Sequence, residues 1–173
     1  MKSTLFIYSS TDGQTKTIIS RIKSFLSNDI DSMLMPIAEV SGQDIAKFDR
    51  IIIGASIRYG KHKKELYEFI DLHLDELAKK DNAFFSVNVV ARKPEKNTPN
   101  TNPYMKKFLL QTSWEPKNLA VFAGKIDYPK YNFIDKQMIR LIMWITKGPT
   151  NTSGTYEFTD WDKVDSFAKN VIK

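Results

Sequence analysis

The run RIIIG at Arg50–Gly54 is the feature of this 173-residue sequence that most limits its fold. Three consecutive β-branched residues ending in glycine are typical of a strand that is buried on both faces. Such a strand lies inside a sheet whose two faces are covered, and the strands of such sheets are mostly parallel and joined through helices. The fold must therefore supply helices on both sides of this strand.

The rest of the chain alternates between strand-like runs and runs with helical periodicity. Further strands are predicted at Thr4–Tyr8, Ser32–Ile37, Ala83–Val90 and Leu119–Ala123. Helices are predicted at Thr15–Leu26, Lys63–Ala78 and Tyr104–Gln111, and at Trp161–Val171 behind a capping Asp160. Five strands alternating with helices predict an α/β fold, a doubly wound five-stranded parallel sheet in one domain spanning residues 1–173.

The first strand ends in a polar turn with the composition of a phosphate-binding loop. This turn consists of Ser9, Ser10, Thr11, Asp12, Gly13, Gln14 and Thr15. Doubly wound sheets bind ligands at the carboxyl ends of their strands, and hydroxyls with free N–H groups at a helix N-terminus favour phosphate. From these residues alone, a Ser/Thr-rich helix cap without a ligand stays open as the simpler interpretation.

The spacing of this turn resembles a known cofactor motif. Ser9, Thr11, Gly13 and Thr15 are similar to the flavodoxin pattern S/T-x-T-G-x-T, which holds the phosphate of FMN. Asp12, placed ahead of the glycine, departs from that pattern. Because a carboxylate beside a phosphate is unfavourable, we expect Asp12 to point to solvent.

Two further loops follow the third and fourth strands at the same edge of the sheet. They hold Ala55, Ser56, Ile57, Arg58, Tyr59 and Gly60, and then Ser86, Val87, Asn88, Val89, Val90 and Ala91. In flavodoxins the corresponding loops flank the isoalloxazine ring, so the resemblance implies that these residues lie at the cofactor. Tyr59 is either a ring that stacks on the flavin or substrate, or a surface aromatic. His62 is expected to cap a helix or face solvent rather than to transfer a proton.

Three longer segments carry a more specific resemblance. They read IGASIRYGKHKKEL at 53–66, FFSVNVVARKPEKNTPNTNPYMKKFL at 84–109 and FAGKIDYPKYNFIDKQMIRLIMWITKG at 122–148. With SSTDGQT near the start and TDW near the end, they resemble the flavodoxin-like, menaquinone-dependent protoporphyrinogen IX dehydrogenases of bacterial haem synthesis. The resemblance implies an FMN enzyme that removes six electrons from protoporphyrinogen IX and passes them to menaquinone or another respiratory quinone. No residue is singled out as a catalytic base.

The positive charge of the chain is concentrated in one segment. The sequence has 26 basic and 20 acidic residues, a net charge of +6, and residues 91–147 alone hold 11 basic and 4 acidic residues. Because the porphyrinogen carries two propionates, we expect Arg58, Arg92, Lys93 and Lys96, on loops near the flavin, to bind them. For each of these four residues the alternative is a solvated surface charge.

A segment at about residues 127–154 is not needed for a five-strand fold, and we interpret it as an insertion near the fifth strand. Within it, residues 133–147 contain no proline or glycine and predict an amphipathic helix, on which three basic residues share an arc of about 40°. Basic amphipathic helices with interfacial aromatics bind membrane surfaces or partner proteins. A quinone dissolves in the bilayer, so we expect an anionic membrane to contact Lys136, Arg140, Met143, Trp144 and Lys147. The alternative is a helix packed on the protein's own core.

Composition narrows the other possible functions. The absence of cysteine excludes disulfides, thiolate metal sites and iron–sulfur clusters, and two histidines argue against a structural zinc site. The longest apolar runs, about five residues, are too short for a signal peptide or a spanning helix. We therefore expect a protein on the cytoplasmic side of the inner membrane, bound to it peripherally.

Two other functions compete with the dehydrogenase. Nucleic-acid binding, suggested by the basic segment, is rejected because no binding module is present and the basic residues are interleaved with a long apolar helix. A non-enzymatic flavodoxin that carries electrons between proteins stays open. Its weakness is that electron carriers docking on basic reductases are expected to be acidic.

Overall fold

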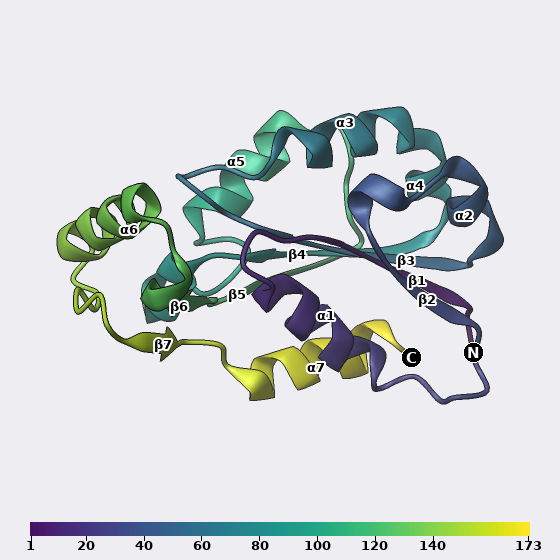
Figure 1. The fold of residues 1–173 in the computed structure, drawn as a ribbon. Coiled ribbons are helices and arrows are strands. Elements are labelled where there is room, and N and C mark those ends of the chain that lie inside the picture. The colour runs from purple at the N-terminus through teal and green to yellow at the C-terminus, as the bar shows by residue number, and fades with distance from the viewer.

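Five parallel strands form the central sheet of the protein, whose computed structural model describes all 173 residues (Figure 1). The strand order is β2-β1-β3-β4-β5. The strands span β1 Thr4–Ser9, β2 Ser32–Pro36, β3 Arg50–Ser56, β4 Asp81–Val87 and β5 Asn118–Phe122. The RIIIG run forms most of β3, the middle strand, and the predicted doubly wound parallel sheet is confirmed.

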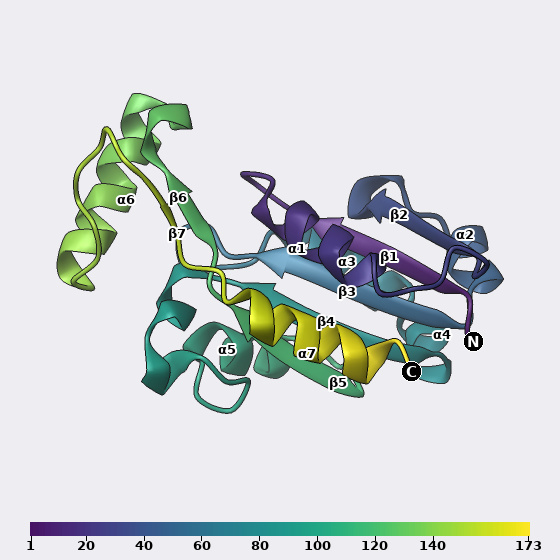
Figure 2. The same ribbon diagram turned by 90° about the horizontal axis from the view of Figure 1, so that it is seen from below.

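Helices cover both faces of this sheet (Figures 1 and 2). One face is covered by α1 (Gln14–Lys23) and α7 (Trp161–Val171). The other face is covered by α2 (Gly42–Lys47), α3 (Lys64–Leu72), α4 (Leu74–Lys79) and α5 (Pro103–Gln111). Short 3₁₀ turns lie in the connections, at η1 Ile37–Glu39, η2 Val89–Arg92, η3 Pro94–Lys96 and η4 Tyr128–Lys130.

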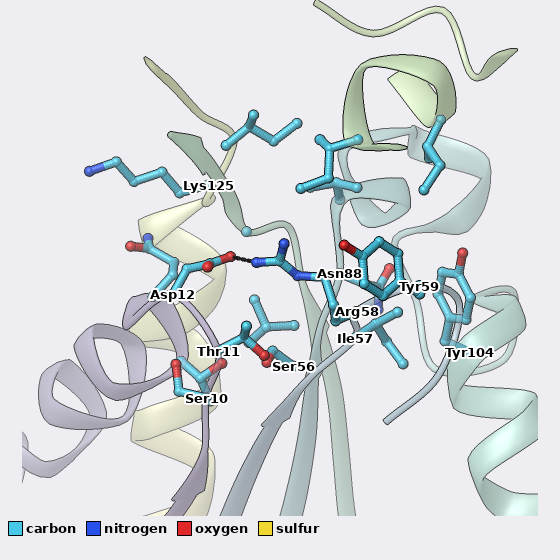
Figure 3. A pocket seen from close by; sticks show the side chains of 18 of the residues that line it. Ser10, Thr11, Asp12, Ser56, Ile57, Arg58, Tyr59, Asn88, Tyr104 and Lys125 are labelled. Atoms are coloured by element: carbon cyan, nitrogen blue, oxygen red, sulfur yellow. Dashed lines mark hydrogen bonds and ion pairs between the residues drawn. The ribbon is translucent and has the colours of Figure 1, made fainter. Parts of the chain in front are cut away.

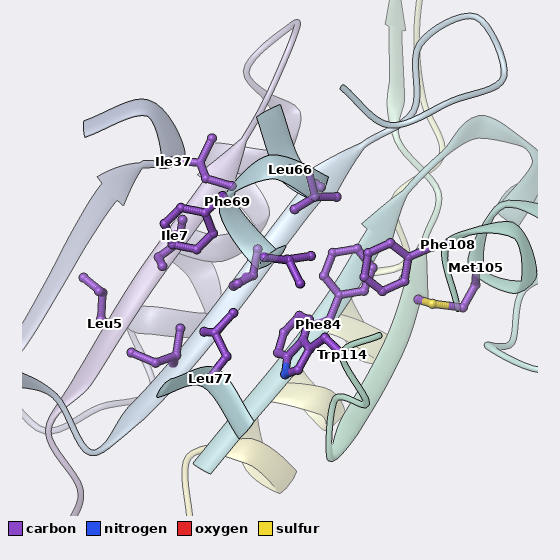
Figure 4. Packing of buried hydrophobic residues seen from close by; sticks show 14 of the residues in the cluster. Leu5, Ile7, Ile37, Leu66, Phe69, Leu77, Phe84, Met105, Phe108 and Trp114 are labelled. Atoms are coloured by element: carbon purple, nitrogen blue, oxygen red, sulfur yellow. The ribbon is translucent and has the colours of Figure 1, made fainter. Parts of the chain in front are cut away.

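Side-chain alternation along the strands divides the core into two layers. Leu5, Ile7 and Phe84 face α3 and α5, where they pack with Leu66, Phe69, Met105, Phe108 and Trp114 (Figure 4). Phe6, Ile52 and Phe85 face α1 and α7 on the opposite side. Gly54 lies in β3 beside this second layer, and a Cβ atom there would overlap the ring of Phe85, which explains the glycine at that position.

The structure corrects two of the predicted boundaries. The helix predicted at Lys63–Ala78 is broken into α3 and α4 at His73, whose ψ of 17° is not helical. The strand predicted at Ala83–Val90 ends at Val87, because the chain turns there into η2, with the Asn88 side chain accepting from the Ala91 N–H.

The segment between β5 and α7 forms a separate small unit at one end of the molecule (Figure 1). β6 (Lys125–Asp127) pairs with β7 (Thr155–Glu157) as an antiparallel ladder, and between them lies α6 (Phe133–Ile145). Asn132 caps α6 by accepting from the Asp135 N–H at 2.8 Å. The helix predicted over 133–147 thus forms, but it ends two residues earlier, and Lys147 lies beyond it at φ 60°. None of the helices has the length and apolar character that crossing a membrane requires.

Candidate functional site

A pocket lies at the carboxyl ends of β1, β3 and β4, beneath α6 (Figure 3). From β1 the chain first continues to β2 on one side of β1 and then crosses to β3 on the other side. The direction of strand addition therefore reverses between β1 and β3. This switch point is where doubly wound sheets bind ligands. The loops after β1, β3 and β4 line the pocket from below, and residues of β6 and α6 line it from above.

The N-terminus of α1 offers the pocket an anion site. Gly13 precedes the helix at φ 90°, no side chain caps the helix, and no acidic residue lies in its first turn. The Ser10 hydroxyl accepts from the Gly13 N–H at 2.9 Å, which shapes the turn. Free N–H groups and the positive end of the helix dipole therefore face a position suited to phosphate.

Two buried hydroxyls at the pocket have no partner within the protein. They belong to Thr15, in the first turn of α1, and to Ser56, at the end of β3. A buried hydroxyl without a hydrogen bond costs about 1–3 kcal/mol. A polar ligand in the pocket would remove that cost, so these two orphaned atoms favour an occupant with oxygen-rich groups.

Asp12 is exposed, as expected from its sequence position, but its carboxylate is not free. It forms an ion pair with Arg58 beside the anion site (Figure 3). The Arg58 guanidinium also lies 5.1 Å from the ring centre of Tyr131, just before α6, and 5.9 Å from that of Tyr59. Arg58 thereby compensates the carboxylate that departs from the flavodoxin pattern, and it ties the β3 loop to the segment that leads into α6.

Aromatic side chains form the other end of the pocket. Tyr59, at φ 52°, is 44% exposed at the rim, with Tyr104 near it (Figure 3). Tyr131 lines the pocket from the α6 side, and burial raises the pKa of its hydroxyl. Positive φ is uncommon for a residue with a side chain, so the backbone at Tyr59 is a local outlier at the rim of the pocket.

A buried polar network holds the loops around the pocket. His62 Nε2 lies 3.0 Å from the Ser86 hydroxyl, which accepts from Asn88 at 3.3 Å. Asn102 donates to the Asn88 side chain at 2.9 Å and caps α5. His62 is only 3% exposed, so the expectation that it caps a helix or faces solvent is wrong. Burial, followed by repulsion from Lys107, lowers its pKa to about 4, so His62 is neutral at pH 7.

Most of the residues expected at the cofactor do line this pocket. They are Ser10, Thr11, Asp12, Gln14 and Thr15 after β1, residues 56–60 after β3, and residues 87–89 after β4. Six expected residues do not line it: Ser9, Gly13, Ala55, Ser86, Val90 and Ala91. Ser9 instead donates to Glu65 at 2.9 Å, and Ala55, Ser86, Val90 and Ala91 are buried in the fold.

The upper wall of the pocket was not predicted from the sequence. Gly124, Lys125 and Ile126 of the β6 region and Ile139, Ile142 and Met143 of α6 line it. No local signal shows that this segment folds back over the loops. The one relevant sequence feature is that apolar residues of the 133–147 helix cover more than one of its sides.

The cationic residues expected near the substrate are spread apart. Arg92 donates to the Thr146 carbonyl and to the Val89 carbonyl, each at 2.9 Å, and lies over the Phe158 ring. Its guanidinium therefore anchors the end of α6 to η2, and burial lowers its pKa. Lys93 and Lys96 do not line the pocket. Propionate binding by these three residues gains no geometric support.

The residues expected to meet a membrane do not all lie on the outward side of α6. Met143 is fully buried against Ile126 and Tyr128, so the expectation that it contacts a membrane is wrong. The outward face is apolar and carries Ile134, Met138, Leu141 and Ile145, with Phe133 and Trp144 beside it. Arg140 and Lys147 are exposed, whereas Lys136 is half-buried.

Comparisons with known proteins agree with this architecture. A flavodoxin domain family model matches residues 5–153. Protoporphyrinogen IX dehydrogenase (quinone) of Escherichia coli is 41% identical over 169 residues, which are 97% of this chain and 93% of that protein. The Leishmania major protein of the same name is 40% identical over 96% of this chain and 73% of its own length.

Solved structures show the same fold at low identity. A short-chain flavodoxin associated with a bacterial microcompartment aligns over 99% of this chain and 97% of its own, with a TM-score of 0.58 and 13% identity. A Lactobacillus acidophilus flavoprotein solved with FMN covers 70% of this chain and 93% of its own, with a TM-score of 0.53 and 17% identity. The chain therefore belongs to the flavodoxin domain family and, within it, to the protoporphyrinogen IX dehydrogenase (quinone) family.

Proposed function

We propose that this protein is an FMN-dependent oxidoreductase that converts protoporphyrinogen IX to protoporphyrin IX and passes the electrons to menaquinone or another respiratory quinone. The end-to-end similarity to dehydrogenases of that name supports this substrate and this class of acceptor. The structural observation that carries the proposal is the position of α6, which lines the pocket on one side and presents an apolar face on the other.

The residues around the pocket fit FMN. The free N-terminus of α1, with the hydroxyls of Ser10 and Thr15, would hold the phosphate. Ser56 and the loops 57–60 and 87–89 would flank the ring system. When bound, FMN supplies the two-electron redox chemistry. The protein's own residues bind and orient the reactants, and α6 with Tyr131 excludes water from one side of the pocket.

A membrane surface is the partner that suits the outer face of α6. Ile134 and Trp144 are each 72% exposed and Ile145 is 65% exposed, which is unfavourable in water. The neighbouring Arg140 and Lys147 favour an anionic surface. These residues support our proposal that the protein binds peripherally to the cytoplasmic side of the inner membrane, where a bilayer-dissolved quinone would come close to the pocket.

An anaerobic assay tests the reaction. FMN-loaded protein, protoporphyrinogen IX and a water-soluble menaquinone analogue should yield fluorescent porphyrin faster than free FMN does. A rate equal to that of free FMN would instead support the non-enzymatic electron carrier, which needs only the flavin site and a protein partner.

Vesicle flotation tests the membrane contact. Replacing Ile134, Leu141 and Ile145 by serine should abolish binding to anionic vesicles, slow the reaction with bilayer menaquinone and leave FMN binding and the soluble quinone reaction intact. Leu110→Ser is the matched control, because Leu110 is 88% exposed on α5, away from α6. Equal vesicle binding by the triple variant and the unmodified protein would contradict the proposed surface.

A further inference from the structure

A second groove opens beside the cofactor pocket, on the side of α3 and α5. The two cavities share Thr11, Arg58 and Tyr59, so Tyr59 stands between them. A ligand lying in the groove would therefore reach the edge of the pocket. The proposed function assigns no role to this groove.

The groove is lined by five cationic side chains and by no carboxylate. Three of the five are engaged elsewhere. Arg58 pairs with Asp12, Lys63 donates to the Ser10 carbonyl at 3.0 Å, and Lys64 lies 2.5 Å from Glu68.

The other two, Lys61 and Lys107, form no ion pair and are exposed. They come from different elements, the β3–α3 loop and α5. Each ammonium group is therefore free to bind an anion, and the pair suits a ligand with two carboxylates.

The walls between these charges are aromatic. Tyr59 forms one wall, and Tyr67 forms another, held by its hydroxyl bond to Gln111 at 3.0 Å and by its ring 6.0 Å from that of Phe108. His62, at the buried side of the groove, is neutral at pH 7 and leaves the lysines as the source of charge. Aromatic walls with two free cations fit a large apolar ring system that carries two carboxylates.

We propose that this groove binds the propionate edge of the porphyrinogen, with Lys61 and Lys107 as the carboxylate partners and Tyr59 as the wall between that edge and the cofactor pocket. The inference rests on the proposed function, and it replaces Lys93 and Lys96 as the substrate's cationic partners. The macrocycle would extend from the groove past Tyr59 towards the pocket.

Binding of the product, protoporphyrin IX, to FMN-loaded protein tests this assignment by fluorescence titration. The double variant Lys61→Glu/Lys107→Glu should weaken binding of the diacid at least tenfold and leave binding of its dimethyl ester unchanged. FMN affinity should also stay the same, which shows that the variant is folded. The matched control is Lys106→Glu/Lys169→Glu, with the same change in charge at exposed positions outside the groove; Lys106 is the helical neighbour of Lys107.

The control should lose less than twofold in affinity for the diacid. Equal weakening by both double variants would overturn the inference, because only net charge would then matter. A tenfold loss on Lys93→Glu/Lys96→Glu with none on the groove variant would also overturn it. If the unmodified protein oxidises protoporphyrinogen IX but the groove variant binds the diacid normally, only this inference fails. If the unmodified protein neither oxidises protoporphyrinogen IX nor binds the porphyrin, the proposed function fails as well.

Discussion

Replacing His62 by glutamine tests whether the buried network behind the pocket is held by a neutral histidine. The ring of His62 packs edge-on against Phe84 and Phe108, with centroids 5.8 and 5.6 Å away, and its Nε2 lies 3.0 Å from Ser86. Burial, reinforced by the charge of Lys107, lowers the pKa from 6.5 to about 4. Glutamine keeps a polar group for Ser86 and removes the titration.

The sign of the effect follows from the two protonation states. The unfolded chain gains a proton on His62 as the pH falls through about 6.5, whereas the folded protein gains it only near 4. Protonation therefore favours the unfolded state, and stability is lost as the pH falls through this window. At about 1.4 kcal/mol per pKa unit, the full loss is about 3 kcal/mol, of which about 2 kcal/mol falls between pH 7 and pH 5.

Urea unfolding at pH 7 and pH 5 measures this loss, at one saturating FMN concentration so that the contribution of the ligand is similar in all variants. His62→Gln should be less stable than the unmodified protein at pH 7, yet it should lose about 2 kcal/mol less on going to pH 5. His73→Gln is the matched control, since burial lowers the pKa of His73 as well but a larger part of that residue is exposed. Identical pH dependence of the unmodified protein and His62→Gln would refute the reasoning.

Three further variants test other parts of the structure. Thr15→Val removes an unpartnered buried hydroxyl, so we expect a roughly tenfold loss of FMN affinity by flavin titration, with no loss of stability in the flavin-free protein. Gly54→Ala places a methyl group against the Phe85 ring and should cost about 1–3 kcal/mol in urea unfolding. Asp81→Asn removes the carboxylate from the buried guanidinium of Arg50, so thermal and urea unfolding should show a loss of about 3 kcal/mol.

The central sheet could be predicted from the sequence because short runs of neighbouring residues determine where its strands lie. The run at β3 is apolar on both faces, and the polar turn after β1 stands directly before a helix, so strand and loop positions follow from neighbouring residues. The pocket loops were predicted for the same reason: in a parallel sheet the ends of β1, β3 and β4 meet at one edge.

The placement of α6 could not be predicted, because its helix is apolar on more than one side. Periodicity groups Met143 with Ile134 as apolar, but Met143 is buried towards the pocket and Ile134 lies outside. The same limitation applies to His62, which stands among Lys61, Lys63 and Lys64 in the sequence and therefore resembles a surface residue. Only the tertiary packing of its ring against the core shows otherwise.

The anchoring of α6 connects its proposed membrane-facing surface to the cofactor pocket. Before α6, Tyr131 packs against Arg58 of the β3 loop; after α6, Thr146 accepts from Arg92 of η2. Both ends of the helix are thus attached to loops of the cofactor pocket, and Ile139, Ile142 and Met143 of its second half form the pocket wall. A helix is about 10 Å thick, so a bilayer touching the outer face would lie about that distance from the pocket. With the proposed membrane contact at this helix, a quinone dissolved in the bilayer would come within reach of the cofactor, which a contact elsewhere on the sheet would not achieve.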